Sequence, residues 1–196
     1  MKIVIARYNE NINWIKKIYL LLNKKNVIIF NKGKNNIKEF DSIPLENVGR
    51  EGHTYYKYIY DNYNNLDDYT IFLQGNPFDH SPEIIKSIKQ IINMKNNNNK
   101  LNINFNFLTK NILKCNLSGC SHHHGLPLID VYEKLFNKKK DKMDFIFGAG
   151  AQFIVSKKQI LERPRDFYLK IINLLNNNIN PIEGFVIERF HKLIFS

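Results

Sequence analysis

Two titratable side chains, Asp79 and His80, follow a short apolar segment in the middle of the chain. This segment, residues 69–73, is β-branched and aromatic, which predicts a buried central strand. Gly75-Asn76-Pro77 ends it, because these residues turn a chain, and Ser81-Pro82 is typical of a helix start. Open α/β sheets bind ligands between the carboxyl end of a strand and a helix N-terminus. We therefore expect the centre of a site at Asn76, Asp79 and His80, the last two as candidate ligands of a metal ion.

A second charged group comprises Arg50, Glu51 and His53, which we place in a turn before a helix that runs to about residue 63. Arginine and histidine in such a turn suit the recognition of phosphate or carboxylate. Local salt bridging explains the same residues equally well. Both interpretations stay open at this point.

The segment from Cys120 to His124 gathers thiol and imidazole groups and could bind zinc. No second ligand pair follows at the spacing of a structural zinc site, so a substrate-contacting or simply exposed loop is the stronger expectation. Cys115 and Cys120 are the only cysteines, and we expect them to be reduced in a cytosolic protein.

Near the end of the chain, Glu188 and His191 are three residues apart in a predicted helix and share one of its faces. A glutamate and a histidine on one face can transfer protons. An ion pair of Glu188 with Arg189, or with Lys192, is the simpler alternative.

The elements around these residues predict an α/β fold in a single domain, residues 1–196, with a mostly parallel central sheet flanked by helices. A strand–helix–strand start predicts a right-handed parallel unit. Strands are expected at 2–6, 27–30, 69–73, 101–107 and 152–155, with an extended segment at 43–48. Helices are expected at 13–22, 49–63, 83–94, 126–136, 157–161, from 164, and at 182–193, and 95–100 is expected to be a loop. Gly148-Ala-Gly150 lacks the third glycine of a dinucleotide fingerprint.

Composition bounds the class of protein. A chain of 196 residues with 43% hydrophobic residues can build one sizeable core. No apolar run approaches the roughly 20 residues of a membrane helix, so we expect a soluble intracellular protein without a membrane segment. The net charge of +11 suits phosphate-bearing partners, but lysine and asparagine are abundant throughout, and nucleic acid is not the partner we expect.

Five motifs together resemble an uncharacterised domain-of-unknown-function family found in bacteria, fungi and large DNA viruses, so the source could be a large DNA virus. The motifs occur in the right order over nearly the whole chain. They are ARYNE at 6–10, NVGREGHTY at 47–55, FLQGNPFDH at 72–80, GAQFIVS at 150–156 and ERFHKLIF at 188–195.

The layout of the family is similar to that of glycosyltransferases of the GT-A type. The resemblance implies a nucleotide sugar as donor and a glycan or another hydroxyl compound as acceptor. It places the nucleotide at the Asn9-Glu10 turn, the acceptor near residues 148–152, and the catalytic base at Glu188. The residues expected to hold the donor and its partners are Arg7, Asn9, Glu10, Arg50, Glu51, His53, Asn76 and Gln152, and the expected catalytic residues are Asp79, Glu188 and His191.

The chain departs from that layout at one motif. Gln74-Gly75-Asn76 stands where GT-A enzymes carry the Asp-X-Asp that binds a divalent metal. Asp79 and His80 could hold Mn²⁺ or Mg²⁺ in another geometry, or cations could neutralise the diphosphate, namely Arg7, Lys32 and Arg50. Two other functions remain open: a metal-dependent hydrolase that uses Asp79, His80, His53 and residues 122–124, and a non-catalytic nucleotide- or carbohydrate-binding module.

Overall fold

A computed structural model describes residues 1–35, 37–98 and 101–196. The main sheet has six strands in the order β3-β2-β1-β4-β8-β5. The strands are β1 Lys2–Arg7, β2 Val27–Asn31, β3 Ile43–Pro44, β4 Tyr69–Gln74, β5 Phe105–Phe107 and β8 Phe153–Ser156. The first four strands of that order run parallel, and β8 lies antiparallel to both β4 and β5. The sheet is therefore mainly parallel, as predicted, with one reversed strand.

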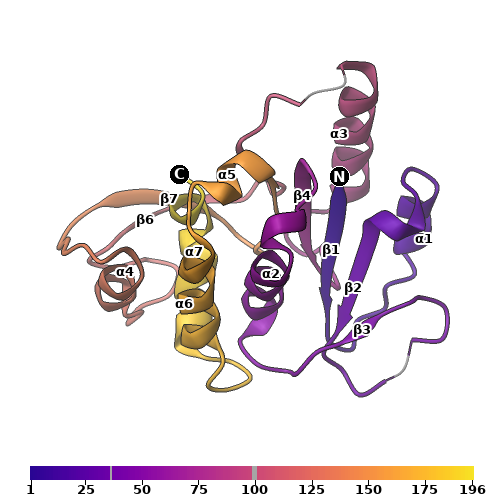
Figure 1. Ribbon diagram of the computed structural model, residues 1–196. Helices are drawn as coiled ribbons and strands as arrows, with labels where there is room; N and C mark the ends of the chain where they lie inside the picture. Colours follow the sequence, from indigo (N-terminus) through magenta and orange to yellow (C-terminus); the bar gives the residue numbers. More distant parts are fainter. Residues whose placement is uncertain (36, 99–100) are drawn as a thin grey trace.

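The middle of the sheet is apolar on both faces because helices cover both faces. Ile3 and Ile5 of β1 point to one core, and Val4 and Ala6 point to the other. The first core contains α1 Ile15–Tyr19 and α3 Ile84–Asn98. The second contains α2 Arg50–Asp61, α4 Leu128–Phe136, α5 Lys157–Leu161, α6 Arg165–Leu175 and α7 Ile182–Ile194. Figure 1 shows α1 and α3 on one side of the strands and α2, α6 and α7 on the other.

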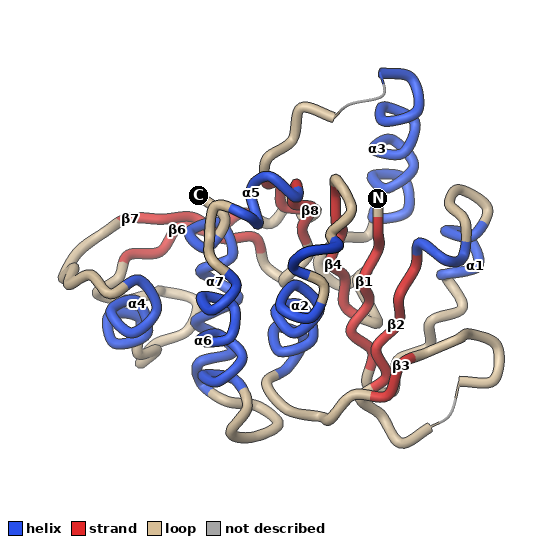
Figure 2. The backbone as a smooth tube through the Cα atoms, viewed as in Figure 1, coloured by secondary structure: helices blue, strands red, loops and turns tan. Residues whose placement is uncertain are grey.

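A second, two-stranded antiparallel sheet extends the larger core. It consists of β6 Ile112–Asn116 and β7 Asp144–Gly148, and β7 packs against α7. In Figure 2 these two strands lie beyond α6 and α7, away from β1 to β4. Neither strand was predicted. Residues 112–116 mix exposed and buried positions, and β7 has an apolar run of only three residues, 145–147.

Most predicted elements are confirmed, including the parallel pairing of β1 with β2. Ser156 caps α5 as expected, since its hydroxyl accepts the N–H of Gln159. Several boundaries were wrong: α1 is shorter than 13–22, the alternating segment 101–107 forms a strand only at its end, and α3 continues to Asn98. The rest of the expected 95–100 loop lies outside the described residues. Two short 3₁₀ helices, Lys24–Asn26 and Tyr63–Asn65, complete the elements.

Among the described residues, no helix is long and apolar enough to cross a membrane.

Candidate functional site

A cavity of ≈ 470 Å³ opens where β1, β2 and β4 end and α2 begins. Strand β1 has β2 on one side and β4 on the other, and the helices that connect these strands, α1 and α2, cover opposite faces of the sheet. Such a switch point leaves a crevice at the carboxyl edge of a parallel sheet. Six charged residues line the cavity: Arg7, Lys32, Arg50, Glu10, Glu51 and Asp79. The cavity wall thus carries both positive and negative side chains, which can bind an anionic group and a hydroxyl group side by side.

Lys32 is a buried cation of the cavity wall, with 8% of its surface exposed, close to the 7% of Arg7. It follows β2, and its Nζ donates to the carbonyl oxygens of Val48 and Arg50. Burial lowers its pKa from 10.5 to about 8, although the charges of Glu51 and Glu46 oppose that shift. Lys32 therefore joins the end of β2 to the start of α2 and places a positive charge beside the cavity.

Arg7 and Glu10 shape the turn after β1. The Arg7 guanidinium donates to the carbonyl of Glu10 at 3.1 Å and to Asn31 Oδ1 at 2.7 Å, so it ties this turn to the end of β2. The Glu10 carboxylate accepts the N–H of Tyr8 at 2.7 Å. A Cβ atom added to Gly75, directly after β4, would lie 2.5 Å from Glu10 Oε2, so a larger residue there would displace the Glu10 carboxylate.

The N-terminus of α2 forms another part of the wall. Gly49 and Arg50 both have positive φ, 62° and 53°, in the left-handed region. Their N–H groups donate to the carbonyls of Asn178 and Ile179 at 2.9 and 3.2 Å, which anchors the loop between α6 and α7. Arg50, Glu51 and His53 therefore stand in the first turn of α2 and not in a turn before it, which corrects the sequence prediction.

The Arg50 side chain is held on three sides. Its NH1 donates to Asn180 Oδ1 at 3.1 Å, its Cζ lies 4.1 Å from the ring centre of Phe185, and its Nε lies 3.8 Å from Glu51 Oε2. A cation held in this way needs little reorganisation to meet a phosphate. Local salt bridging and anion recognition, the two interpretations of this group, are therefore compatible.

Glu188 lies close to Glu51 but does not belong to the cavity lining. Its Oε1 accepts the N–H of Gly150 at 2.9 Å, and its Oε2 lies 3.7 Å from NH1 of Arg189. Burial and the charge of Glu51 raise the pKa of Glu188, while the Gly150 N–H and the guanidinium groups of Arg189 and Arg50 act in the opposite direction. The expected ion pair with Arg189 is thus present, but in a buried environment.

Asp79 and His80 do not converge on one point. Asp79 lines the large cavity and accepts a hydrogen bond from Asn76 Nδ2 at 3.2 Å, whereas His80 lines a separate cavity of ≈ 140 Å³ beside α3. Adjacent side chains in this turn point in different directions, so the predicted metal pair is not assembled. Nowhere in residues 1–35, 37–98 and 101–196 do three His, Cys, Asp or Glu side chains group so that they could hold a metal ion.

Four other predicted residues lie outside the cavity lining. His53 is buried, and burial together with the charges of Lys32 and Lys57 lowers its pKa to about 4. His191 is buried in the larger core, where its Nδ1 is 2.7 Å from the Tyr56 hydroxyl. Gln152 is buried too and donates to the carbonyl of Pro77 at 3.0 Å, and Asn9 is exposed beside Gly33. These side chains support the fold around the site.

The loop 149–151, between β7 and β8, holds Glu188 in place, and its geometry gives a testable prediction. Gly150 has φ +91°, and a Cβ atom there would lie 2.6 Å from Cβ of His80. We expect Gly150→Ala to lower the free energy of unfolding by about 1–3 kcal/mol, measured by denaturant titration. Gly119→Ala is the control, because a Cβ atom at Gly119 meets nothing within 4 Å. Equal stability of the two variants would contradict the prediction.

The comparison with known proteins agrees with the motifs. A family described as "Protein of unknown function (DUF3431)" matches residues 3–196. The chain belongs to this family. No curated protein and no solved structure matches the chain.

Several residues that line the cavity were not among the predicted site residues. They are Tyr8, Asn47, Gln74 and Ile179. The first three directly adjoin predicted site residues or strand ends, and this position in the sequence could have indicated that they line the cavity. Ile179 carried none, because it reaches the cavity only through the backbone contacts of its loop with Gly49 and Arg50.

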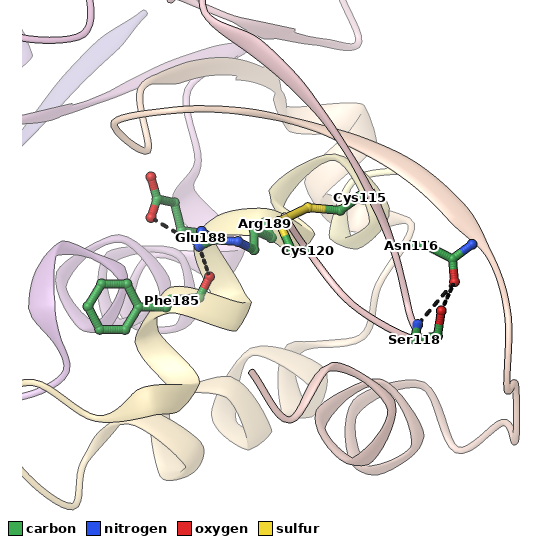
Figure 3. The surroundings of a disulfide bond; sticks show 7 residues. All are labelled: Cys115, Asn116, Ser118, Cys120, Phe185, Glu188 and Arg189. Carbon is green, nitrogen blue, oxygen red and sulfur yellow. Dashed lines mark hydrogen bonds and ion pairs between the residues drawn. A yellow bond between two sulfur atoms is a disulfide. The ribbon is translucent and has the colours of Figure 1, made fainter. Parts of the chain in front are cut away.

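The cysteine- and histidine-rich loop lies on the far side of α7 from the main sheet. Cys115 and Cys120 form a disulfide, so the prediction of reduced thiols was wrong; their Cα atoms are 4.8 Å apart because the chain turns back through an Asn116–Gly119 bridge. Figure 3 shows this disulfide beside Arg189 of α7. His123 packs its ring 4.6 Å from that of Phe185, while His122 and His124 are exposed. A zinc site, the weaker expectation for this loop, is therefore not assembled, and His122 and His124 fit the exposed loop that was the stronger one.

Proposed function

We propose that this protein is a glycosyltransferase of the GT-A type, which transfers a sugar from a nucleotide-sugar donor to a hydroxyl acceptor. The observation that carries the proposal is the cavity itself. At one switch point of a mainly parallel sheet, it gathers three cations, Arg7, Lys32 and Arg50, and three carboxylates, Glu10, Glu51 and Asp79. Sugar transfer requires both kinds of group, because the diphosphate leaves with negative charge and the acceptor hydroxyl must lose a proton.

The donor diphosphate would lie against Lys32, Arg7 and Arg50 near the N-terminus of α2. Each of these cations is already oriented by hydrogen bonds to the protein, so the site is preorganised for charge that develops on the leaving oxygen. The carboxylates of Glu10 and Asp79 and the side-chain oxygens of Gln74 and Asn76 line the same cavity, so these four residues would supply the protein ligands of a divalent ion bound with the diphosphate. A bound Mn²⁺ or Mg²⁺ needs only one or two protein carboxylates when phosphates complete its shell. Such an ion would neutralise diphosphate charge at this point.

The test is a thermal-shift screen against nucleoside diphosphates and nucleotide sugars, with and without manganese. Ligand at about 100 times its Kd stabilises a protein by about 2.7 kcal/mol, so we expect one nucleotide class to raise Tm by roughly 5–10 °C. Turnover of the matching nucleotide sugar, followed as release of the nucleoside diphosphate, completes the test. Manganese dependence of the shift would implicate Glu10 and Asp79.

A non-catalytic binding module is the second candidate, because Gln74-Gly75-Asn76 stands where carboxylates are expected. Nucleotide binding without turnover of any nucleotide sugar would favour it. A shift with manganese or zinc alone would favour the metal-dependent hydrolase. Absence of any nucleotide effect would contradict the proposed function.

A further inference from the structure

Glu51 and Glu188 form a carboxylate pair of which only one member faces the cavity. Glu51 lines it, whereas Glu188 stands behind Glu51 on α7. We infer that Glu51 is the catalytic residue that takes the proton of the acceptor hydroxyl. Glu188 is a positioning residue, whose fixed carboxylate acts electrostatically on Glu51. This inference rests on the proposed function and reverses the role that sequence resemblance gave to Glu188.

The oxygens of Glu188 are already engaged. Oε1 accepts the Gly150 N–H at 2.9 Å. Oε2 lies 3.7 Å from NH1 of Arg189, and this NH1 donates to the carbonyl of Phe185 at 2.8 Å (Figure 3). The Arg189 guanidinium also lies 4.7 Å from the ring centre of Phe147, so it is fixed from two directions. A carboxylate anchored at both oxygens is well suited to hold a charge in place and poorly suited to swing toward a substrate.

The carboxylate of Glu51, in contrast to that of Glu188, is not anchored by hydrogen bonds. It lies in the first turn of α2, where the helix N-terminus favours a negative charge. Its nearest cation is Arg50, with Nε 3.8 Å from Oε2, and within the described part of the chain no donor makes a hydrogen bond to its carboxylate. A base needs a lone pair free to accept a proton, and Glu51 has one at the cavity surface.

The two carboxylates influence each other electrostatically. After burial, the charge of Glu51 is the second cause that raises the pKa of Glu188, so the two carboxylates lie within electrostatic reach of each other. When Glu51 takes a proton, its negative charge is lost and the ionised form of Glu188 is less disfavoured. The charged and titratable groups that face the pair are Arg50, Arg189, Lys32, Tyr55 and Glu10.

Tyr55 supports this arrangement from one turn further along α2. Its side chain is fully buried, and its hydroxyl has no hydrogen-bond partner in the described structure. Burial and then the charges of Glu51 and Glu188 raise its pKa. Tyr55 thus remains a neutral neighbour that does not compete with Glu51 for the substrate proton.

The step balances as a single displacement. Glu51 takes the proton of the acceptor hydroxyl, and the oxygen of that hydroxyl forms a bond to the anomeric carbon of the donor sugar. The bond between this carbon and the diphosphate oxygen breaks, and its electron pair leaves with the diphosphate. The cations Arg7, Lys32 and Arg50 then stabilise the diphosphate charge.

Two isosteric variants, Glu51→Gln and Glu188→Gln, separate the roles, with Glu183→Gln in the first turn of α7 as the matched control. The assay uses the nucleotide sugar and acceptor found for the wild type, and the binding probe is the corresponding nucleoside diphosphate. We expect Glu51→Gln to lower kcat about 10²–10⁴-fold with Kd for the diphosphate changed less than about 3-fold. Glu188→Gln should lower kcat only about 10-fold, because Glu188 does not take the proton of the substrate.

A readout without turnover tests the pairing itself. Carboxyl ¹³C NMR titration should show Glu188 titrating at lower pH in Glu51→Gln than in the wild type. Independent titration would overturn the pair, and a larger kcat loss in Glu188→Gln than in Glu51→Gln would restore Glu188 as the base. Turnover that survives in Glu51→Gln overturns only the role of Glu51, whereas a wild type that turns over no nucleotide sugar overturns the proposed function as well.

Discussion

Lys32→Met is expected to weaken binding of nucleoside diphosphates about 10-fold or more, equivalent to about 1.4 kcal/mol, and to destabilise the fold. Methionine matches the four-atom aliphatic part of the lysine side chain but has no ammonium group to donate to the carbonyls of Val48 and Arg50. A buried carbonyl that loses its donor costs about 1–3 kcal/mol. Part of this loss is offset because the variant no longer buries an ammonium group. We therefore expect a net loss of about 1–3 kcal/mol in the free energy of unfolding.

The control for this prediction is Lys34→Met, which removes the same charge from an exposed position two residues away. Isothermal titration calorimetry gives the affinity, and urea unfolding gives the stability. Because burial lowers the pKa of Lys32 to about 8, diphosphate affinity in the wild type should decline as pH rises through that value. That decline should be absent in Lys32→Met. If Lys32→Met matches Lys34→Met in both measurements, Lys32 has neither role.

The parts of the fold that sequence predicted well are those with a strong local signal. The apolar segments of β1 and β4 could only be buried strands, and the spacing of Phe167, Ile171 and Leu175 identified the inner face of α6. The β6–β7 sheet was not predicted, because β6 is half exposed and pairs with β7, and because β7 is buried by its packing against α7. Long-range packing of that kind leaves no local pattern to detect.

In the candidate site too, some features could be predicted from the sequence and others could not. Chain order placed the ends of β1, β2 and β4 at one edge, so Arg7, Glu10, Lys32, Arg50 and Asp79 could be brought together from sequence. Side-chain direction could not be predicted. It decides that Asp79 and His80 face different cavities, and that Glu51 faces the cavity while Glu188 packs behind it.

Titratable residues mislead sequence analysis when the fold buries them. Histidine and glutamate on one helix face suggest proton transfer, but His191 lies in the core beside Phe153 and Tyr56. Because both neighbours come from distant parts of the chain, no spacing within α7 could reveal that burial. The buried histidines nevertheless have a consequence for stability that can be measured.

We expect the protein to lose stability steeply between pH 6.5 and pH 4, because His53 and His191 are buried in their neutral forms. Burial lowers the pKa of His53 to about 4 and that of His191 to about 3, from 6.5. Below pH 6.5 the unfolded chain binds protons that the folded chain cannot, so acid favours unfolding until pH falls to the folded-state values. Each histidine should remove about 2–3 kcal/mol of unfolding free energy by pH 4.5.

Glu188 acts in the opposite direction, since its raised pKa lets the folded state bind a proton before the unfolded chain does, which offsets part of the loss. Urea unfolding at pH 7.0 and pH 4.5 therefore compares the wild type with His53→Gln and with the exposed-site control His124→Gln. His53→Gln should lose roughly half of the acid response, because glutamine does not titrate and leaves His191 as the remaining source. His124→Gln should retain all of it. An unchanged response in His53→Gln would mean that His53 is accessible to protons in the folded protein, and that the first turn of α2, which also carries Arg50 and Glu51, opens in acid.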